Sequence, residues 1–318
     1  MKTTEILLTS LLATAFLSGC TDTEEPAVAG SKEAIRITAG IGQTTRAVID
    51  ADYVDNLDIS FARMDNPAAG SSWNSPAIEA VRTGGTGNTA ITFATEQTYL
   101  SGNEESALIG YYPRKALESN VSNPASVAYA ITGDEDIMAT EVQTGALDNK
   151  FTSFTFRHLL TQLQFKCIGS TEAQTKWAAI SSIKVKNVST GLKLSLDKDG
   201  GATLTATGTA NQTLAVKDCP SKVSDMTAAT PSTGYLMLFP VVDMGTETTP
   251  ISLEVTATYS GKAKTQTISI KNITGGAKAG ESHLIALTFA EDGTITADAG
   301  IAAWQSGNGG SSVITPGE

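Results

Sequence analysis

The chain has 318 residues, a formal net charge of −11 and a pI near 4.7. An acidic chain without any basic run is poorly suited to the phosphate backbone of nucleic acids, so composition argues against nucleic-acid binding. At roughly 150 residues per domain, the length favours about two domains.

The N-terminus carries the pattern of a lipoprotein signal. Residues 6–17 form an apolar run that closes with Leu17-Ser18-Gly19-Cys20. An ordinary secretory signal also places small residues before its cleavage site but needs no cysteine there. We therefore expect residues 1–19 to be a signal peptide and Cys20 to be the acylated first residue of an anchored precursor. No later stretch reaches the ~20 apolar residues of a membrane-spanning helix.

Residues 20–34 are polar and acidic and contain Pro and Gly, which predicts a flexible tether. After it, short runs alternate between apolar and polar residues and are separated by Gly, Asn, Asp and Ser. This pattern predicts an all-β fold of the sandwich type. The runs are at 34–41, 57–62, 90–94, 107–112, 161–168, 181–188, 192–196, 202–206, 235–239, 251–259, 265–270 and 283–289.

Two local elements can be predicted further along the chain. The runs at 192–196 and 202–206 are joined by Asp197-Lys198-Asp199-Gly200-Gly201, whose Asp and Gly residues suit a hairpin turn. The best candidate for a short helix is 170–180. We expect very little helix elsewhere.

A faint internal repeat supports two tandem domains. Residues 107–113 and 235–241 are both apolar strands that contain an aromatic-Pro pair, and proline cannot donate to a strand ladder. Each is followed by a run opened by histidine, at 157–166 and 282–289. The spacing suits one sandwich per repeat, which predicts an N-terminal sandwich at 35–168 and a C-terminal sandwich with a tail at 169–318.

Two cysteines remain after Cys20. Cys167 and Cys219 could form a disulfide in an oxidising compartment. However, Cys167 continues the alternation of Leu163 and Phe165, which favours a small, buried, free core residue.

Catalytic chemistry is hard to find in this sequence. It contains no GxSxG, HExxH, P-loop or CxxC motif, and the only histidines are His158 and His283, each at the mouth of a predicted strand. A structural histidine is the ordinary interpretation of such a position. A pair of carboxylates from distant loops could still form a glycosidase site. We expect no enzyme activity.

Metal and sugar sites are also poorly supported. Asp197-Lys198-Asp199-Gly200 resembles the start of an EF-hand loop but lacks the distal glutamate and the flanking helices, so a plain turn is favoured. Asp134-Glu135-Asp136 could hold calcium, but a solvated acidic loop is the simpler interpretation. The three tryptophans are scattered and aromatics make up only 6% of the chain. We expect no metal and no cofactor.

Taken in order, several short motifs resemble those of the fimbrillin (Mfa-like, FimA-type) lipoproteins of Bacteroidetes. The motifs span nearly the whole chain after the signal, and they are more specific together than singly. They are the lipobox at Leu17–Cys20, residues 35–39 leading to 45–47, Gly110–Pro113, Asp136–Ala139, Phe156–Phe165, Gly280–Leu284 and Ile301–Trp304.

The resemblance implies two tandem transthyretin-like β-sandwich domains and a structural subunit of a cell-surface fimbria, or pilus, that supports adhesion. It also implies anchoring in the outer membrane by lipid, removal of the N-terminal strand by an Arg-specific protease, and replacement by a C-terminal segment of another fimbrial subunit. The replacement is physically reasonable, because an open strand edge is a liability that an added strand removes.

The resemblance directs attention to one strand and one cleavage site. In the run at 35–41, Ile35, Ile37, Ala39 and Ile41 should share one face and point into the core. Cleavage at Arg46-Ala47, in a polar segment, would release this strand and the lipid together. Arg36 lies within the predicted strand, where pairing should protect it.

The C-terminus departs from a good donor pattern, because only Val313 and Ile314 are apolar after Trp304. Either Thr294–Trp304 contributes to donation, or the chain is a tip or accessory subunit that accepts a strand without donating one. Two other functions stay open at this point: a monomeric surface lipoprotein that binds a glycan or host ligand, and a surface hydrolase.

Overall fold

The computed structural model describes residues 32–42, 49, 53–68, 71–74, 76–118, 122–228 and 233–301. In these ranges the chain forms twenty β-strands, one short α-helix and one 3-10 turn, η1 (Ser101–Asn103). The prediction of an all-β fold with very little helix is therefore confirmed.

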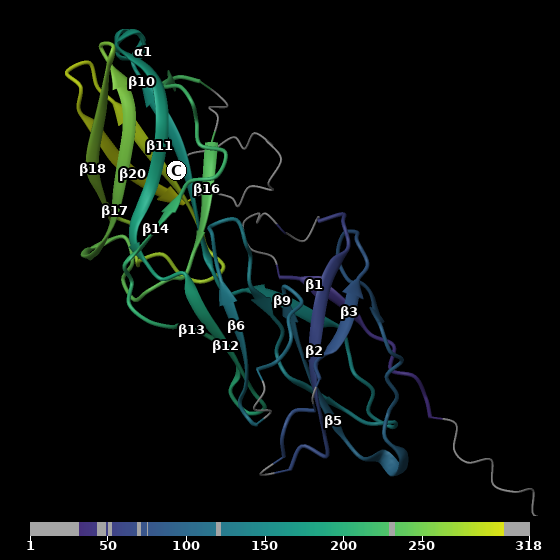
Figure 1. The fold of residues 1–318 in the computed structure, drawn as a ribbon. Coiled ribbons are helices and arrows are strands. Elements are labelled where there is room, and N and C mark those ends of the chain that lie inside the picture. The colour runs from purple at the N-terminus through teal and green to yellow at the C-terminus, as the bar shows by residue number, and fades with distance from the viewer. Residues whose placement is uncertain are drawn as a thin grey trace, which may run out of the picture. The chain divides into compact units, whose positions relative to one another are not determined.

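Eight strands of the first half form one sheet, in the order β2-β3-β4-β1-β9-β7-β5-β8. Figure 1 labels β1, β2, β3, β5 and β9 of this sheet. Because β5 also pairs with β2, the neighbours form a closed ring of seven strands, with β8 added beside β5. The strands are β1 (Thr38–Ile41), β2 (Leu57–Asp65), β3 (Ile78–Arg82), β4 (Thr89–Phe93), β5 (Ser106–Tyr112), β7 (Met138–Ala139), β8 (Gln143–Gly145) and β9 (Phe154–His158).

Two sheets of the second half share one apolar core, as a sandwich requires. Trp177, at the start of one sheet, packs edge-on against Phe289 of the other, with ring centroids 5.1 Å apart. The first sheet contains β10 (Thr161–Gly169), β15 (Ser224–Asp225), β16 (Thr233–Leu238), β19 (Ser282–Phe289) and β20 (Ile295–Ile301). The second contains β11 (Trp177–Val188), β14 (Gln212–Ala215), β17 (Thr246–Tyr259) and β18 (Lys262–Asn272).

A third small sheet joins strands from both halves. It consists of β6 (Ala125–Ala130), β12 (Gly191–Asp197) and β13 (Gly201–Ala206). The predicted hairpin is present, and Asp197 Oδ1 accepts hydrogen bonds from the amides of Asp199 and Gly200, each at 2.8 Å. Gly201 adopts a φ of 73°, which glycine tolerates best.

The predicted helix is shorter than expected. α1 (Thr171–Lys176) begins after Ser170, whose side chain accepts a hydrogen bond from the amide of Ala173. It ends at Lys176, and Trp177 already belongs to β11. Tertiary pairing with β17 overrides the helical preference of the last four residues.

The run at 157–166, predicted as one strand, is two. β9 ends at His158 and β10 begins at Thr161. β10 pairs with β16 and β19, so it belongs to the sheets of the second half. The division into two domains, at 35–168 and 169–318, stays a proposal.

Both cysteine thiols are free. Cys167 is fully buried in β10, and burial, followed by the nearby Cys219, raises its thiol pKa. Burial also raises the thiol pKa of the half-buried Cys219. Neither thiol is therefore activated as a nucleophile.

We expect two titratable thiols in a Cys20→Ser variant unfolded without reductant, because Cys167 and Cys219 are not bonded. In the folded protein a thiol reagent such as dithionitrobenzoate should react slowly with Cys219 and not with Cys167, which is inaccessible. Unfolding that releases no thiol would contradict this, since it would mean that the two cysteines are linked.

Candidate functional site

Strand β1 is a central strand held on both sides. It pairs antiparallel with β4, where Thr38 faces Ala90, and parallel with β9, where Ile41 faces Phe156. The pairing continues beyond the strand, because the amide of Gly42 donates to Phe156 O at 2.7 Å. β1 therefore closes the ring between β4 and β9, and its loss would leave two open edges.

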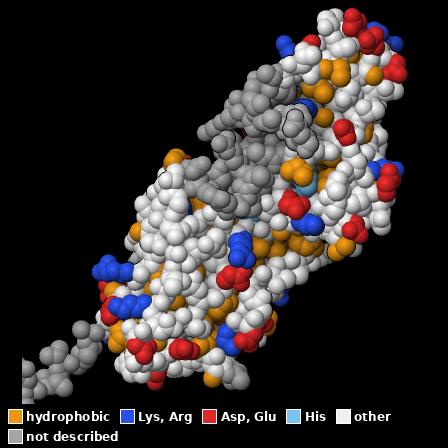
Figure 2. Space-filling model, turned by 180° about the vertical axis from the view of Figure 1, so that it is seen from behind, with side chains coloured by type: hydrophobic (Ala, Val, Ile, Leu, Met, Phe, Trp, Pro, Cys, Tyr) orange, Lys and Arg blue, Asp and Glu red, His pale blue; other side chains and the backbone are white. Residues whose placement is uncertain are grey.

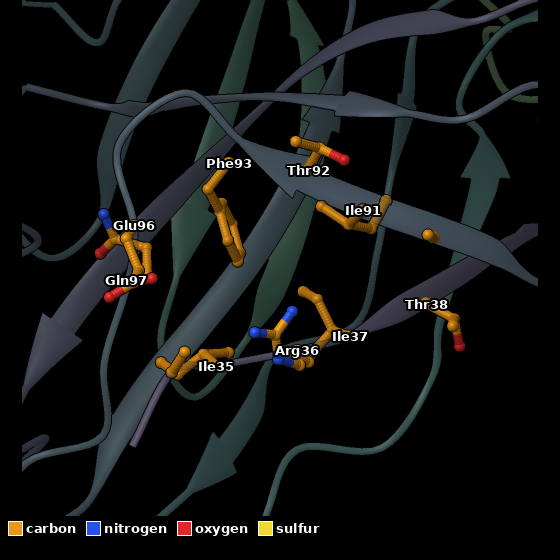
Figure 3. A pocket seen from close by; sticks show the side chains of 11 residues that line it. Ile35, Arg36, Ile37, Thr38, Ile91, Thr92, Phe93, Glu96 and Gln97 are labelled. Carbon is orange, nitrogen blue, oxygen red and sulfur yellow. The ribbon is translucent and has the colours of Figure 1, made fainter. Parts of the chain in front are cut away.

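The segment before β1 is also held by backbone hydrogen bonds. The amide of Ile91 donates to Ile37 O at 3.0 Å, and the amide of Ile35 donates to Gln97 O at 2.7 Å. Between these contacts a groove of about 480 Å³ opens, lined by residues 34–38 on one side and by residues 90–93, Glu96 and Gln97 on the other. In Figure 3, Arg36 and Phe93 extend into this groove from its two sides.

The inward face of this segment matches the prediction. The exposed fractions are 5% for Ile35, Ile37 and Ile41 and 0% for Ala39. Burying three isoleucines contributes on the order of 5–9 kcal/mol, at roughly 1.5–3 each. That is comparable to the net stability of a typical domain.

Aromatic rings form the bed on which these side chains lie. The same apolar cluster contains Phe61, Phe154 and Phe156. Phe61 contacts the other two edge-to-face, with centroids 5.3 and 6.4 Å apart. Because these rings are large and apolar, removal of β1 would expose a large apolar surface.

Arg36 was expected within the strand and protected by pairing, and the structure agrees only in part. It lies before β1, not within it, and its side chain is exposed. The backbone on either side is nevertheless held, through the bonds at Ile35 and Ile37.

A buried arginine, Arg82 at the end of β3, donates a hydrogen bond to the backbone of β1. Its guanidinium has no exposed surface and donates from Nε to Ala39 O at 3.0 Å. It also donates to the carbonyls of Thr83, Gly85 and Gly87, at 3.4, 3.0 and 2.8 Å. The cation is thus satisfied by backbone oxygens of one turn and of β1. Sequence analysis missed Arg82, although its alternation with the buried Ala80 was a signal.

Gly40 lies where β1 approaches the same turn. A Cβ at this position would lie 2.4 Å from Asn88 Oδ1, inside van der Waals contact. A side chain here would force Asn88 to move. Arg82 thus binds the carbonyl of position 39, and the side chain of Asn88 lies beside position 40.

The other predicted residues lie outside the described ranges. These are Cys20, Arg46 and Ala47. The chain on either side of Arg46 is described at Gly42 and at Ile49, and Ile49 is buried in the same apolar cluster as β1.

The two histidines and the acidic residues 134–136 contact other side chains of the fold. His158 Nδ1 lies 2.7 Å from Asp136 Oδ2, and both side chains are buried. The interpretation of 134–136 as a solvated loop is therefore wrong for Asp136, which turns inward, while Asp134 pairs with Lys217 at 3.1 Å. Burial lowers the pKa of His283, although Glu281 opposes this shift.

Within the described residues, no group of three or more His, Cys, Asp or Glu side chains is placed to hold a metal ion. None of the helices there is long and apolar enough to span a membrane. On the face in Figure 2, acidic and basic side chains are interspersed and are not gathered in a single charged patch. The groove around β1 is thus the best-defined candidate site.

The fold and this site define an all-β protein whose first described strand completes a closed sheet over an aromatic core. The chain belongs to the fimbrillin-like family, whose profile matches residues 30–304. No curated protein matches it.

Solved structures share the fold at low sequence identity. A candidate cell adhesion protein from Bacteroides uniformis superposes with a TM-score of 0.59 at 13% identity, covering 86% of this chain and 98% of its own. One from Bacteroides ovatus gives 0.53 at 17%, covering 87% and 99%. A fimbrial protein from Bacteroides vulgatus gives 0.50 at 17%, covering 84% and 99%.

Replacing Arg82 tests how much its hydrogen bonds to β1 and to the turn after β3 contribute to stability. Arg82→Lys should lower the free energy of unfolding by about 2–4 kcal/mol, because a lysine cannot reach all four carbonyls and leaves buried acceptors unpaired. Urea denaturation measures the effect. Arg157→Lys is the matched control, because Arg157 is an exposed cation on β9 that pairs with Glu141, and it should change stability by less than about 0.5 kcal/mol. Equal effects of the two variants would contradict a special role for Arg82.

Proposed function

We propose that this protein is a structural subunit of a cell-surface fimbria that supports adhesion. It is exported as a precursor anchored in the outer membrane through a lipid on Cys20. An Arg-specific protease cuts at Arg46-Ala47, the segment that ends in β1 leaves, and a strand of another subunit takes its place. No catalytic step and no cofactor is part of this function.

The position of β1 is the observation that carries the proposal. This strand is the first described strand of the chain, it stands between β4 and β9, and its apolar face lies in the core. A single cut at Arg46-Ala47 therefore severs the chain between β1 and the next described strand, β2. Family membership points to the same function.

Loss of β1 would destabilise the sheet, so that binding of a replacement strand is favoured. The aromatic bed around Phe61 becomes exposed, β4 and β9 become open edges, and Arg82 loses the carbonyl of Ala39. An incoming strand restores all three at once through backbone pairing and side-chain burial. Proteolysis can thus drive assembly, because the trimmed subunit is unstable alone.

The part of the chain after the cut remains attached to the subunit. Ile49, which lies in the same apolar cluster as β1, is retained after the cut. The exchange therefore concerns the face occupied by Ile35, Ile37, Ala39 and Ile41.

The lipid anchor can be tested directly. Cells grown with a fatty-acid probe should label the unaltered protein and not a Cys20→Ala variant, because only the thiol of Cys20 receives the lipid. Equal labelling of the two proteins would rule out anchoring at this residue.

The assembly step can be tested with trypsin. Brief digestion of the purified precursor should cut after Arg46 first, and the trimmed protein should then oligomerise in size-exclusion chromatography and negative-stain microscopy. An Arg46→Gln variant should resist this cut and stay monomeric. If the trimmed protein stays monomeric, binds no donor strand and melts at the precursor's temperature, the exchange mechanism is wrong.

A further inference from the structure

The edge strand β13 in the second half carries no residue that would prevent another strand from pairing with it. It is the outer strand of the sheet β13-β12-β6 and pairs with β12. Residues 200–211 read GGATLTATGTAN and contain no charged side chain and no proline. Such residues normally protect an exposed edge, because its free row of backbone donors and acceptors otherwise pairs with another strand. The edge of β13 is therefore open to pairing.

Other edge strands of the described sheets are protected. β18 carries Lys262, Lys264 and Lys271 along its eleven residues. β20 is held against β18 by side chains, since Asn272 Nδ2 donates to Asp298 Oδ1. β8, β14 and β15 are short, with three, four and two residues. Lysines, cover by a neighbour and short length are the means by which native edges avoid pairing, and the six residues of β13 show none of them.

The free backbone groups of β13 belong to alternate residues of the strand. The amide of Thr207 donates to Gly191 O at 2.8 Å, so in the same register Thr203 and Thr205 also bond to β12. The amides and carbonyls of the residues between and beside them therefore point away from β12. These residues are Ala202, Leu204 and Ala206.

The sequence of β13 reads the same in both directions. Residues 202–206 are ATLTA, with Leu204 at the centre, and glycines stand at both 200 and 208. When two such strands run antiparallel with Leu204 facing Leu204, each Ala faces an Ala and each Thr faces a Thr. In this register the outward-pointing backbone groups of one strand also face those of the other. Each free donor then meets a free acceptor, and no strand has to move.

The side chains on both faces of β13 suit this pairing. Its apolar side chains are half-buried and pack at the margin of the large apolar core, so a second copy would extend this row and cover it. Thr203 and Thr205 are exposed on the other face, where Thr–Thr pairs across two strands are favourable. The chain already contains such a pair, because the hydroxyl oxygens of Thr256 on β17 and Thr265 on β18 lie 3.0 Å apart.

We propose that β13 is an interaction surface through which two copies of this chain pair edge to edge, antiparallel, about a two-fold axis at Leu204. Both copies contribute the same strand, so the contact is isologous and closes on itself. It is separate from the strand exchange proposed above, because β1, Arg46 and the groove take no part in it. Uncleaved and trimmed chains therefore pair alike.

The contact is weak between free copies in solution. Two six-residue strands bury less area than the roughly 1,600 Å² of a standard protein interface, so dimers form at roughly 0.1–1 mM and dissociate in dilute chromatography. Copies held side by side on a membrane or along a fibre have a higher effective concentration. There the same contact joins neighbours laterally.

The first experiment uses the fact that position 204 faces itself. The chain from residue 20 onward, with Cys20→Ser, should dimerise reversibly in sedimentation velocity as its concentration rises. Leu204→Lys and Leu204→Glu should each weaken dimerisation by roughly tenfold or more, because like charges then face each other. An equimolar mixture of the two should dimerise again, because Lys then faces Glu. Ala263→Lys, exposed on β18, is the matched control and should leave dimerisation unchanged.

The second experiment fixes the register and leaves the half-buried Leu204 unchanged. In a background with Cys20→Ser and Cys219→Ser, Thr203→Cys and Thr205→Cys are placed in separate copies of different mass. Across the two-fold axis these positions form a non-hydrogen-bonded pair with Cα atoms about 4.5 Å apart, which a disulfide can span. The oxidised mixture should therefore form a linked heterodimer. Each variant alone should link much more slowly, because its cysteines then lie diagonally.

The outcomes separate this proposal from the proposed function. A chain that stays monomeric up to about 1 mM and forms no linked heterodimer overturns the β13 contact. Dimers that Leu204→Lys does not weaken show that another surface joins the copies, which also overturns it. Faster linking of either cysteine variant alone than of the mixture overturns the register. All three results leave strand exchange intact, whereas a trimmed chain that fails the trypsin test overturns the exchange and leaves the β13 contact intact.

Discussion

The N-terminal sheet depends on a four-residue strand that closes a ring of hydrogen-bonded neighbours. β1 supplies the ladder between β4 and β9, and its side chains complete the apolar cluster that Phe61, Phe154 and Phe156 build. Arg82 adds a constraint of a different kind, since a fully buried cation must have acceptors and one of them is the carbonyl of Ala39. Backbone pairing, core packing and charge satisfaction all meet on this strand. Loss of this strand would therefore remove all three contributions at once.

Much of this architecture could be predicted from the sequence, because half-buried strands alternate with a period of two residues. The alternation of Ile35, Ile37, Ala39 and Ile41 predicts their buried face, and Asp197 with its glycines predicts the hairpin. The alternation does not reveal which strands become neighbours. The parallel pairing of β1 with β9 and the placement of β10 beside β19 are set by contacts between distant segments, and no local pattern records them.

The site was less accessible to sequence reasoning for a similar reason. Arg82 is recognisable only from its position on the inward face of β3, and its acceptors are carbonyls, which every residue has. Asp136 and His158 are 22 residues apart, and their pairing follows from the fold that brings β7 beside β9. The side chain that lies beside Gly40 belongs to Asn88, in a neighbouring turn. Each feature depends on a close approach that appears only once the chain has folded.

If subunits assemble by the strand exchange proposed above, the parallel alignment of β1 with β9 sets the geometry of assembly. A strand that takes this place must run in the same direction as β9 to restore the inward face and the acceptor for Arg82. Each junction then joins unlike surfaces of two subunits, and such contacts repeat without closing unless their rotation brings the chain of subunits back on itself. A fibre built in this way has two different ends, one with a vacant groove and one with an unused strand. Growth can then be controlled at a single end by any protein that fills the groove and offers no strand of its own.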